Sequence, residues 1–529
     1  MASSASSGES PASDPVKKLE AEAEMLRREA EQSLEHARKI EEENHQRHAL
    51  QQLQEQQLAP MTIHKLQVHG ATNTRRSLLD SIFSPLVSDA ANSGSTLGDV
   101  TAGLRDASHK LDRLGIFHPS PQILLNSAQQ TDPSSTPTDV DIDIALRELP
   151  RYKLNAGTDV GNAEGNAYTS LLCRNLFGGA ELLSLHASAG TRTRSAYSAE
   201  LSAPVLPASD SDGRLALEVL SSATDRPWAS HEQFLRSATL RYAFRSPRSA
   251  ASHSFEYAAA WRQLTSLAAS ASPTVRADAG DSFKSSLRHV FHLDRRDNPQ
   301  LPQSGYAVRS VVELAGLGPL GGDVAFSKSE LELSAATPLA SSWLRNTSLG
   351  AGLRLGMLYP LAPHLVSGRA APSRINDRFT LGGPTDVRGF AMGGLGPHDG
   401  ADAVGGDVFA AGSVNLLLPV PRTAPDSSLR LHLFANGGRL VAMKSQGRKA
   451  GEGADGDVAE GLDAGTVARG MWGAVNDLVR GPPSVAAGVG LVYAHPVARF
   501  ELNFSLPLVL RRGEVGTKGV QVGVGINFL

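Results

Sequence analysis

The sequence LGGPTDVRGF, residues 381–390, is the stretch around which the rest of the chain is organised. Glycines flank it on both sides, and glycine lets a backbone fold back on itself without steric cost. Such a loop can carry its arginine, Arg388, into a confined space. An arginine in a glycine-rich loop is by itself most often a solvated residue. The meaning of Arg388 therefore depends on the segments around the loop.

Composition narrows the class of protein to which these segments belong. The chain has 529 residues, a formal net charge of −3 and 41% hydrophobic residues. The length favours more than one domain, although one large β architecture could take most of it. Near-zero charge argues against a nucleic-acid-binding protein, so no nucleic acid is expected as a partner. No run of about 18 apolar residues predicts a transmembrane helix, but strands that alternate apolar and polar residues can cross a membrane with modest hydropathy.

The number of cysteines and the composition of the N-terminal residues indicate which covalent links and targeting signals the protein has. The single cysteine, Cys173, excludes an internal disulfide and a multi-cysteine metal site. Residues 1–15 contain no basic residue, whereas a secretory signal needs a basic start and an apolar core, and an organellar presequence is rich in arginine. If the protein sits in a membrane, we expect it to reach that membrane without a cleaved N-terminal signal.

Three regions are predicted along the chain. Residues 1–59 are charged and helix-prone, with pairs such as Glu24 and Arg28 at i,i+4 spacing, and predict a charged helical or disordered extension. Residues 60–149 have the pattern strand, helix, helix, strand, strand, which predicts one small α+β domain. Residues 150–529 show no convincing amphipathic helix and many segments with the period-two alternation of β-strands.

The alternation in the third region is compatible with two architectures. Phe500, Leu502 and Phe504 alternate with polar residues, as they would in a soluble sandwich or in a membrane barrel. Strands of about ten residues can be placed with starts near 152, 167, 180, 194, 213, 235, 254, 285, 305, 322, 344, 406, 429, 485, 497 and 520, an even set of sixteen. The two longest connections, 359–405 and 437–484, follow the eleventh and thirteenth strands and so lie on one rim. Long loops on one rim and short turns on the other favour an all-β membrane protein, a sixteen-stranded transmembrane β-barrel preceded by the small α+β domain.

With these elements in order, residues 61–529 resemble the barrel-assembly factor superfamily of outer membranes, known by its bacterial surface antigen domain. Within it, the resemblance is greatest to the barrel subunits of the mitochondrial sorting and assembly machinery. The small domain is similar to a polypeptide-transport-associated domain, RNLFGGAE at 174–181 to the family's second hairpin, and DNP at 297–299 to its mid-barrel turn. VRGF at 387–390 is the most specific likeness, because it matches the loop that the family folds back into its barrel. The lumen-loop residues implied by this match are Val387, Arg388, Gly389 and Phe390.

The resemblance also implies which groups hold Arg388 inside the barrel lumen. The matching wall segment is 434–438, whose alternation puts Phe434 and Asn436 on the lumen face. Asn436 stands where many relatives carry aspartate, and its amide oxygen can accept from a guanidinium more weakly than a carboxylate. Asp407 is another possible partner. Because an unpaired arginine in a confined lumen would be costly, we expect Arg388 to have a partner.

The first and last strands form a second candidate site, a lateral gate where the barrel would close. The last strand has the polar, glycine, hydrophobic, hydrophobic spacing that resembles the signal of mitochondrial barrel precursors, although any final barrel strand alternates in this way. Glycine weakens strand pairing, and an opened edge can accept an extended chain by β-augmentation. The candidate gate residues are Lys153, Asn155, Gly157, Gln521, Gly523, Ile526 and Phe528.

The resemblance implies an insertase of the mitochondrial outer membrane with its N-terminal domain in the intermembrane space, and a plastid relative is the alternative. Its first strand would pair with the C-terminal signal strand of unfolded β-barrel precursors, and its other partners would be accessory subunits of an assembly complex and the lipid bilayer. The alternative is a protein-translocating channel or a passive diffusion pore of similar shape. No Walker loop, dinucleotide fingerprint, G-x-S-x-G or H-E-x-x-H is present. We therefore expect no enzyme activity, cofactor, metal or catalytic residue.

Overall fold

The computed structural model describes residues 59–91, 95–161, 164–205, 212–247, 249–339, 346–363, 369–423, 427–443, 462–495 and 498–525. Almost all of the predicted extension, residues 1–59, lies outside these ranges, as do Ile526 and Phe528. The chain divides into two compact units, of which the second contains everything from Arg147 onward. In the described ranges, no helix has both the length and the apolar character needed to cross a membrane.

Residues 62–145 form a small three-stranded sheet with two helices. Its elements are β1 (Thr62–His69), α2 (Arg76–Ala91), α3 (Leu97–Leu114), β2 (Gln122–Ser127), the single 3-10 turn η1 (Ala128–Gln130) and β3 (Asp139–Ala145). β3 is the middle strand, parallel to β1 and antiparallel to β2. The start of α3 is fixed by a reciprocal cap, in which the Thr96 N–H donates to Asp99 at 3.0 Å and the Asp99 N–H donates to Thr96 Oγ1 at 3.3 Å. The predicted small α+β fold is confirmed.

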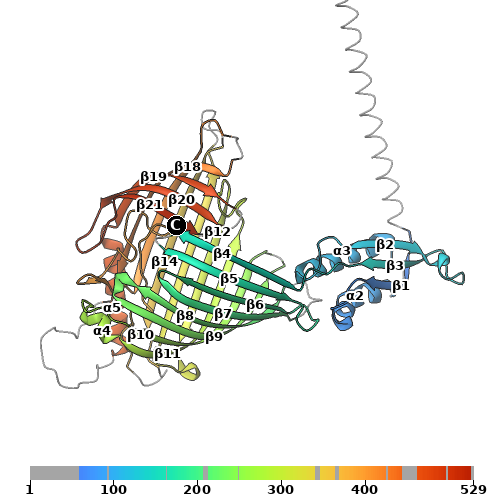
Figure 1. Cartoon of the computed structure of the whole chain (residues 1–529), viewed down its shortest axis with the longest axis horizontal. Helices are drawn as coiled ribbons and strands as arrows, with labels where there is room; N and C mark the ends of the chain where they lie inside the picture. Colours follow the sequence, from blue (N-terminus) through green and yellow to red (C-terminus); the bar gives the residue numbers. More distant parts are fainter. Residues whose placement is uncertain are drawn as a thin grey trace, which may run out of the picture. The chain divides into compact units, whose positions relative to one another are not determined.

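The rest of the chain forms one antiparallel sheet of sixteen strands in sequence order (Figure 1). The strands are β4 (Tyr152–Gly161), β5 (Glu164–Arg174), β6 (Leu182–Gly190), β7 (Thr193–Pro204), β8 (Arg214–Arg226), β9 (His231–Arg245), β10 (Ser252–Thr265), β11 (Gly280–Asp294), β12 (Gly305–Ala315), β13 (Phe326–Pro338), β14 (Ser348–Pro360), β17 (Val408–Pro419), β18 (Leu429–Val441), β19 (Ser484–Ala494), β20 (Arg499–Val509) and β21 (Gly519–Gly525). β4 and β21 are at the two ends of this order and approach each other. We call the boundary between them the seam. The predicted sixteen-stranded barrel is confirmed.

The alternation along each strand separates an outer surface from a lumen. On β20, Phe500 and Leu502 are 40% and 48% exposed, whereas Glu501 and Asn503 are 1% and 2% exposed. Successive side chains of a strand point to opposite faces, so the apolar residues face outward and the polar residues face inward. A polar lumen inside an apolar outer surface is the arrangement that a barrel in lipid requires.

The two longest connections follow β14 and β18, as predicted, and therefore share a rim. Residues 361–407 join β14 to β17, and residues 442–483 join β18 to β19. The short elements in connections on this rim are η2 (Pro227–Ala229), α4 (Pro273–Ala277), η3 (Gly318–Leu320), β15 (His398–Asp399), β16 (Asp402–Ala403) and α5 (Ala464–Arg480). Figure 1 shows α4 and α5 at the same end of the strands.

Helix α5 contradicts the expectation that no amphipathic helix follows residue 150. Its seventeen residues include three glycines and several valines, which have low helix propensity, so the local pattern hid it. The Asp463 side chain caps its first turn by accepting from the Gly465 N–H at 3.3 Å. Val467 and Met471 are buried against barrel residues, and such packing stabilises a helix that propensity alone would not.

Candidate functional site

The candidate site is built around residues 381–396, here called the lumen loop, which lie in the β14–β17 connection. Leu381 and Leu395 close its base through a hydrogen bond of 3.0 Å from the Leu395 N–H to the Leu381 carbonyl. Gly389 has φ +86°, and a side chain there would begin 2.6 Å from the Cβ of Ala486 on β19. Both the left-handed backbone and the close approach require glycine at this position.

Apolar side chains of the lumen loop pack against the inner face of the wall. Leu381, Val387, Phe390 and Leu395 are at most 1% exposed. They share one cluster with wall residues that include Phe409 on β17, Leu440 on β18 and Ala486 on β19. This cluster holds the lumen loop against β17–β19 and fills that part of the lumen.

Arg388 is fully buried and forms a two-point ion pair with Glu501 on β20. Its Nε donates to Oε2 at 2.8 Å and its Nη2 donates to Oε1 at 3.1 Å. The guanidinium carbon lies 5.2 Å from the centre of the Phe434 ring. The planar guanidinium matches a carboxylate in this geometry, so the buried arginine has the partner that its burial requires.

Glu501 also connects Arg388 to further polar groups of the wall. Arg499 Nη2 lies 2.6 Å from Glu501 Oε1, and Asn503 Nδ2 donates to Oε2 at 2.7 Å. His432 on β18 contacts the Asn503 side chain at 3.3 Å. Because these groups are all buried, removal of one leaves another without its partner, and the network acts as a unit.

Phe434 lies beside the Arg388 guanidinium, but the other two predicted wall residues, Asn436 and Asp407, contact other groups than expected. In the amide orientation that satisfies its neighbours, Asn436 accepts from the backbone N–H of Arg388 at 2.7 Å and donates to the Arg388 carbonyl at 3.2 Å. Asn436 thus holds the backbone rather than the guanidinium. The Asp407 carboxylate accepts from Ser373 Oγ at 2.5 Å and from the Met443 N–H at 2.7 Å. The carboxylate that pairs with Arg388 is Glu501.

The lumen loop is also bonded to the last strand and to the segment before it. Gln521 Oε1 accepts from the Gly389 N–H at 2.8 Å, and Gln521 Nε2 donates to the Phe390 carbonyl at 3.3 Å. The Thr517 N–H donates to the Gly389 carbonyl at 2.9 Å. Gly523 pairs with Glu501 in the β20–β21 register. The residues beside Arg388 are therefore fixed to both β20 and β21.

The first strand presents its candidate gate residues on one face. Lys153 and Asn155 are exposed, and Gly157 is half-buried opposite Tyr168 of β5. The hydroxyl of Tyr168 lies 2.7 Å from where a side chain on Gly157 would begin. The structure thus puts the described gate residues on the two strands that border the seam.

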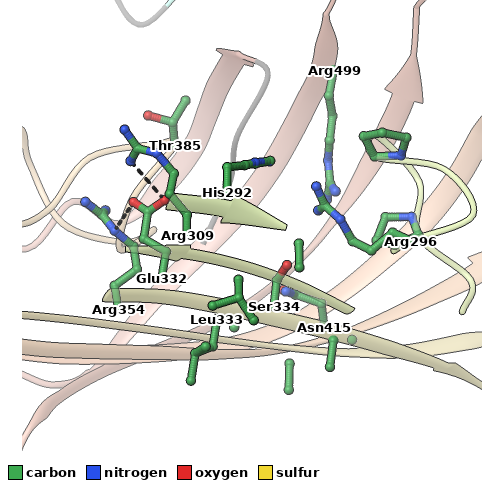
Figure 2. A pocket seen from close by; sticks show the side chains of 18 of the residues that line it. His292, Arg296, Arg309, Glu332, Leu333, Ser334, Arg354, Thr385, Asn415 and Arg499 are labelled. Carbon is green, nitrogen blue, oxygen red and sulfur yellow. Dashed lines mark hydrogen bonds and ion pairs between the residues drawn. The ribbon is translucent and has the colours of Figure 1, made fainter. Parts of the chain in front are cut away.

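A cavity of about 340 Å³ lies in the lumen beside the lumen loop (Figure 2). Figure 2 shows Arg309, Glu332 and Arg354 pointing toward one another from the wall. Glu332 lies 3.2 Å from Arg309 Nη1 and 3.1 Å from Arg354 Nε. Arg354 Nη1 also donates to Asp386 Oδ1 of the lumen loop at 2.5 Å. Asp386 therefore binds the lumen loop to Arg354 of β14, which in turn pairs with Glu332 of β13, whereas Arg388 and Gly389 bind the loop to β20 and β21.

The same connection is bound to the rim beyond the lumen loop. Asp402 accepts from Ser230 Oγ at 2.5 Å and from the Ser272 N–H at 2.7 Å. Burial by itself would raise the pKa of Asp402, but the hydrogen bonds from Ser230 and Ser272 hold that pKa below its ordinary value. The Asp402 side chain is therefore a carboxylate at neutral pH and can keep both contacts.

Sequence reasoning missed Glu501, Arg499 and Asn503 as members of the site. A signal was present, because all three occupy the inward positions of the β20 alternation. The sequence does not show the pairing that brings Glu501 next to a residue 113 positions earlier in the chain. Local alternation gives the face of a residue but not its partner.

Comparison with known proteins identifies the family. The Omp85 superfamily domain matches residues 175–528. This chain belongs to the Omp85 superfamily. A SAM50-like protein of Schizosaccharomyces pombe is 36% identical over 480 residues, which cover 90% of this chain and 93% of that protein. The sorting and assembly machinery component 50 homologue of Bos taurus is 33% identical over 428 residues, covering 80% of this chain and 82% of that protein.

A solved structure agrees with the barrel fold. BamA from Haemophilus ducreyi lacking POTRA domains 1–3 is similar to this chain with a TM-score of 0.65 and 14% identity, covering 88% of this chain and 84% of that one. At that identity the likeness shows the fold alone. The family resemblance expected from the sequence is confirmed, and this Omp85 protein is a β-barrel of the mitochondrial outer membrane whose N-terminal domain lies in the intermembrane space.

Proposed function

We propose that this Omp85 protein inserts β-barrel precursors into the outer membrane by pairing the C-terminal strand of a precursor with its own β4. Relatives that carry the name sorting and assembly machinery component support the kind of activity. The observation that carries the seam mechanism is that the lumen loop is bonded to the two strands on one side of the seam. Glu501 and Gln521 bond the loop to β20 and β21.

Opening the seam would leave β4 with unpaired backbone groups. Its lumen-facing positions Lys153, Asn155 and Gly157 carry no large apolar side chain that would block an incoming strand. An extended precursor strand can add to such an edge through main-chain hydrogen bonds. Since hydrocarbon offers no alternative partner for backbone groups, the growing precursor sheet is driven to pair with itself and close. The proposed cycle needs no nucleotide, metal or catalytic residue.

The contents of the lumen favour this function over a passive diffusion pore. A pore requires an open passage, but Val387 and Phe390 are fully buried in a cluster on the lumen side of the wall. A loop with a buried ion pair is a costly addition to a pore. We also propose that accessory subunits of an assembly complex bind this protein.

Disulfide trapping in isolated mitochondria tests the proposal. The variant carries Cys173→Ser and Asn155→Cys, and the arriving precursor carries one cysteine in its C-terminal signal strand. We expect a crosslink that disappears when the precursor signal is mutated. The matched control is Thr239→Cys in the same background, because Thr239 on β9 faces the lumen opposite Glu218, away from the seam.

The same experiment can overturn the seam mechanism. If Asn155→Cys assembles normally and precursors still arrive, but no signal-dependent crosslink forms, the precursor does not pair with β4. Equal crosslinking to Asn155→Cys and Thr239→Cys would instead indicate passage through the lumen and would favour a translocating channel.

A further inference from the structure

Helix α5 packs on the outer face of the barrel wall rather than in the lumen. Its buried side chains, among them Met471, belong to a cluster with Val408 of β17 and Val441 of β18. The next residue on β17, Phe409, and the residue before Val441 on β18, Leu440, both belong to the lumen cluster. Because successive side chains of a strand point to opposite faces, Val408 and Val441 point outward. α5 therefore lies against the face that the barrel turns to lipid.

The apolar surface of α5 extends beyond the side chains that pack against the barrel. Trp472 and Val479 are 76% and 78% exposed. They are seven residues apart, which is about two helical turns, so they lie on one side of the helix. Val475, between them, packs partly against the wall cluster and joins this side to the buried side. The helix thus has one continuous apolar surface, of which the Trp472–Val479 flank is uncovered in the described part of the chain.

The remaining side of α5 is polar and carries two arginines and one aspartate, Asp477. Arg469 and Arg480 are exposed, and Asn476 lies between them at helical spacing. A helix with a Trp-containing apolar side and a polar side that carries arginines has the pattern of helices that lie in the plane of a membrane interface. Tryptophan itself is enriched at the level of the headgroups.

Arg439 of β18 lies beneath the C-terminal end of α5. It points outward like Val441 two residues later, and it is 8% exposed. A side chain on Gly481, at the C-terminal end of α5, would overlap the Arg439 guanidinium, so the end of the helix lies over this arginine. A cation on the outer face of a barrel is costly at the bilayer midplane and nearly neutral at the interface. α5 shields Arg439 from the acyl chains, and the Asp477 carboxylate of the helix is among the charges that act on its guanidinium.

We propose that α5 is an interfacial helix that lies in the headgroup region of the outer membrane beside β14, β17 and β18. Its Trp472–Val479 flank contacts the outer ends of the acyl chains, and Arg469 and Arg480 face the phosphates. The lipid surface is the occupant because the flank continues the outward apolar surface of the same strands, where Val414 and Leu433 are exposed. The helix would fix the height of this side of the barrel in the bilayer. The proposal does not depend on the insertase function.

Collision accessibility of spin labels tests the proposal on the whole chain in vesicles of phosphatidylcholine and phosphatidylethanolamine. In a Cys173→Ser background, Trp472→Cys and Val479→Cys are labelled one at a time. We expect these labels to collide more with oxygen, which concentrates in lipid, than with a water-soluble nickel complex. The matched controls are Arg469→Cys and Asn476→Cys on the polar side, for which the ratio should be reversed.

Tryptophan fluorescence provides a second measurement that leaves Trp472 in place. One variant keeps Trp472 as its sole tryptophan, and the control variant keeps Trp228, which packs in a separate cluster at the rim. Lipids brominated near the headgroup end of the acyl chain should quench Trp472 and not Trp228. If the labels at positions 472 and 479 collide mainly with the nickel complex, the flank lies in water. If the labels are protected from both oxygen and the nickel complex, and the brominated lipids do not quench Trp472, a protein covers the flank. Either result overturns the proposal.

Discussion

The middle wall of the barrel and its last two strands are held in place by different means. Across β9–β13, lumen-facing charges lie directly opposite one another in register, in the row Arg241, Glu256, Arg288, Glu313 and Lys328. Glu256 lies 3.0 Å from Arg241 and 3.5 Å from Arg288. On β20, by contrast, Glu501 pairs with Arg388 of the lumen loop. The middle wall is joined strand to strand, whereas the last strands are joined to the loop.

This difference indicates which strands of the barrel can change their backbone pairing. In the described part of β4, β5 and β6, no ion pair links one strand to the next, so backbone pairing and apolar contacts hold them. The strands on one side of the seam thus lack the charge row of the middle wall, and those on the other side depend on the lumen loop. Loss of the loop should loosen β20 and β21 and leave β9–β13 intact.

The largest effect is expected from Arg388→Ala. Removing one partner of a buried ion pair typically costs about 3–5 kcal/mol, because the other charge stays buried. We expect the lower part of that range, since Arg499 remains 2.6 Å from Glu501. The urea midpoint of the purified barrel in detergent measures the loss.

Arg309→Ala is the control for this prediction. Arg309 pairs with Glu332 at 3.2 Å, but its side chain is 42% exposed, and exposed pairs contribute at most about 1 kcal/mol. Equal losses for the two variants would contradict a special role of the lumen loop in holding the last strands.

Gly389→Ala should have the next largest effect. The substitution forces a side chain into a backbone with φ +86° and places its Cβ 2.6 Å from Ala486, at a cost of about 1–3 kcal/mol. Gly400→Ala is the matched control, because Gly400 has φ +63° in the same connection with open space around it. If both variants unfold at the same urea concentration, contact with Ala486 contributes nothing.

Gln521→Ala should have a smaller effect on stability and a local effect on exchange. It removes two hydrogen bonds to the lumen loop backbone, each worth about 1 kcal/mol. Hydrogen–deuterium exchange should rise at the backbone amides of β20 and β21 and stay unchanged in β9–β13. Faster exchange spread evenly over the sheet would show that Gln521 does not act on the last strands in particular.

The smallest effect is expected from Glu256→Gln in the middle wall. Arg241 keeps a second carboxylate, Glu218, at 2.9 Å, and partly exposed pairs contribute at most about 1 kcal/mol. Precursor assembly in mitochondria should proceed at the wild-type rate, and the urea midpoint should barely change. A fall in the urea midpoint as large as that of Gln521→Ala would remove the distinction between the two parts of the wall.

Much of the fold could be predicted because the membrane imposes its own pattern. Residues such as Phe500 and Glu501 must alternate when one face meets lipid and the other a polar lumen, so period two survives in the sequence. α5 was missed because its helix depends on contacts with the outer wall rather than on the propensity of its own residues.

The candidate site was predicted only in part, because the sequence indicates the face on which a residue lies but not its partner. The buried position of Arg388 follows from the family resemblance, but its partner depends on which wall strand the loop reaches. Asn436 and Glu501 both occupy inward positions near the loop. Only the three-dimensional arrangement shows that Asn436 contacts the Arg388 backbone and Glu501 its guanidinium.

The pairing of Arg388 with Glu501 also sets an order of events in the biogenesis of this protein itself. The lumen loop precedes β17–β21 in the chain, so the strands that enclose it are synthesised after it. Until β20 arrives, the Arg388 guanidinium has no access to the Glu501 carboxylate and remains hydrated. Burial of the Arg388 guanidinium can therefore be completed only after β20 has joined the sheet. A chain that ends before Glu501 would keep the Arg388 guanidinium without this carboxylate, at the cost of an uncompensated charge wherever the loop is buried.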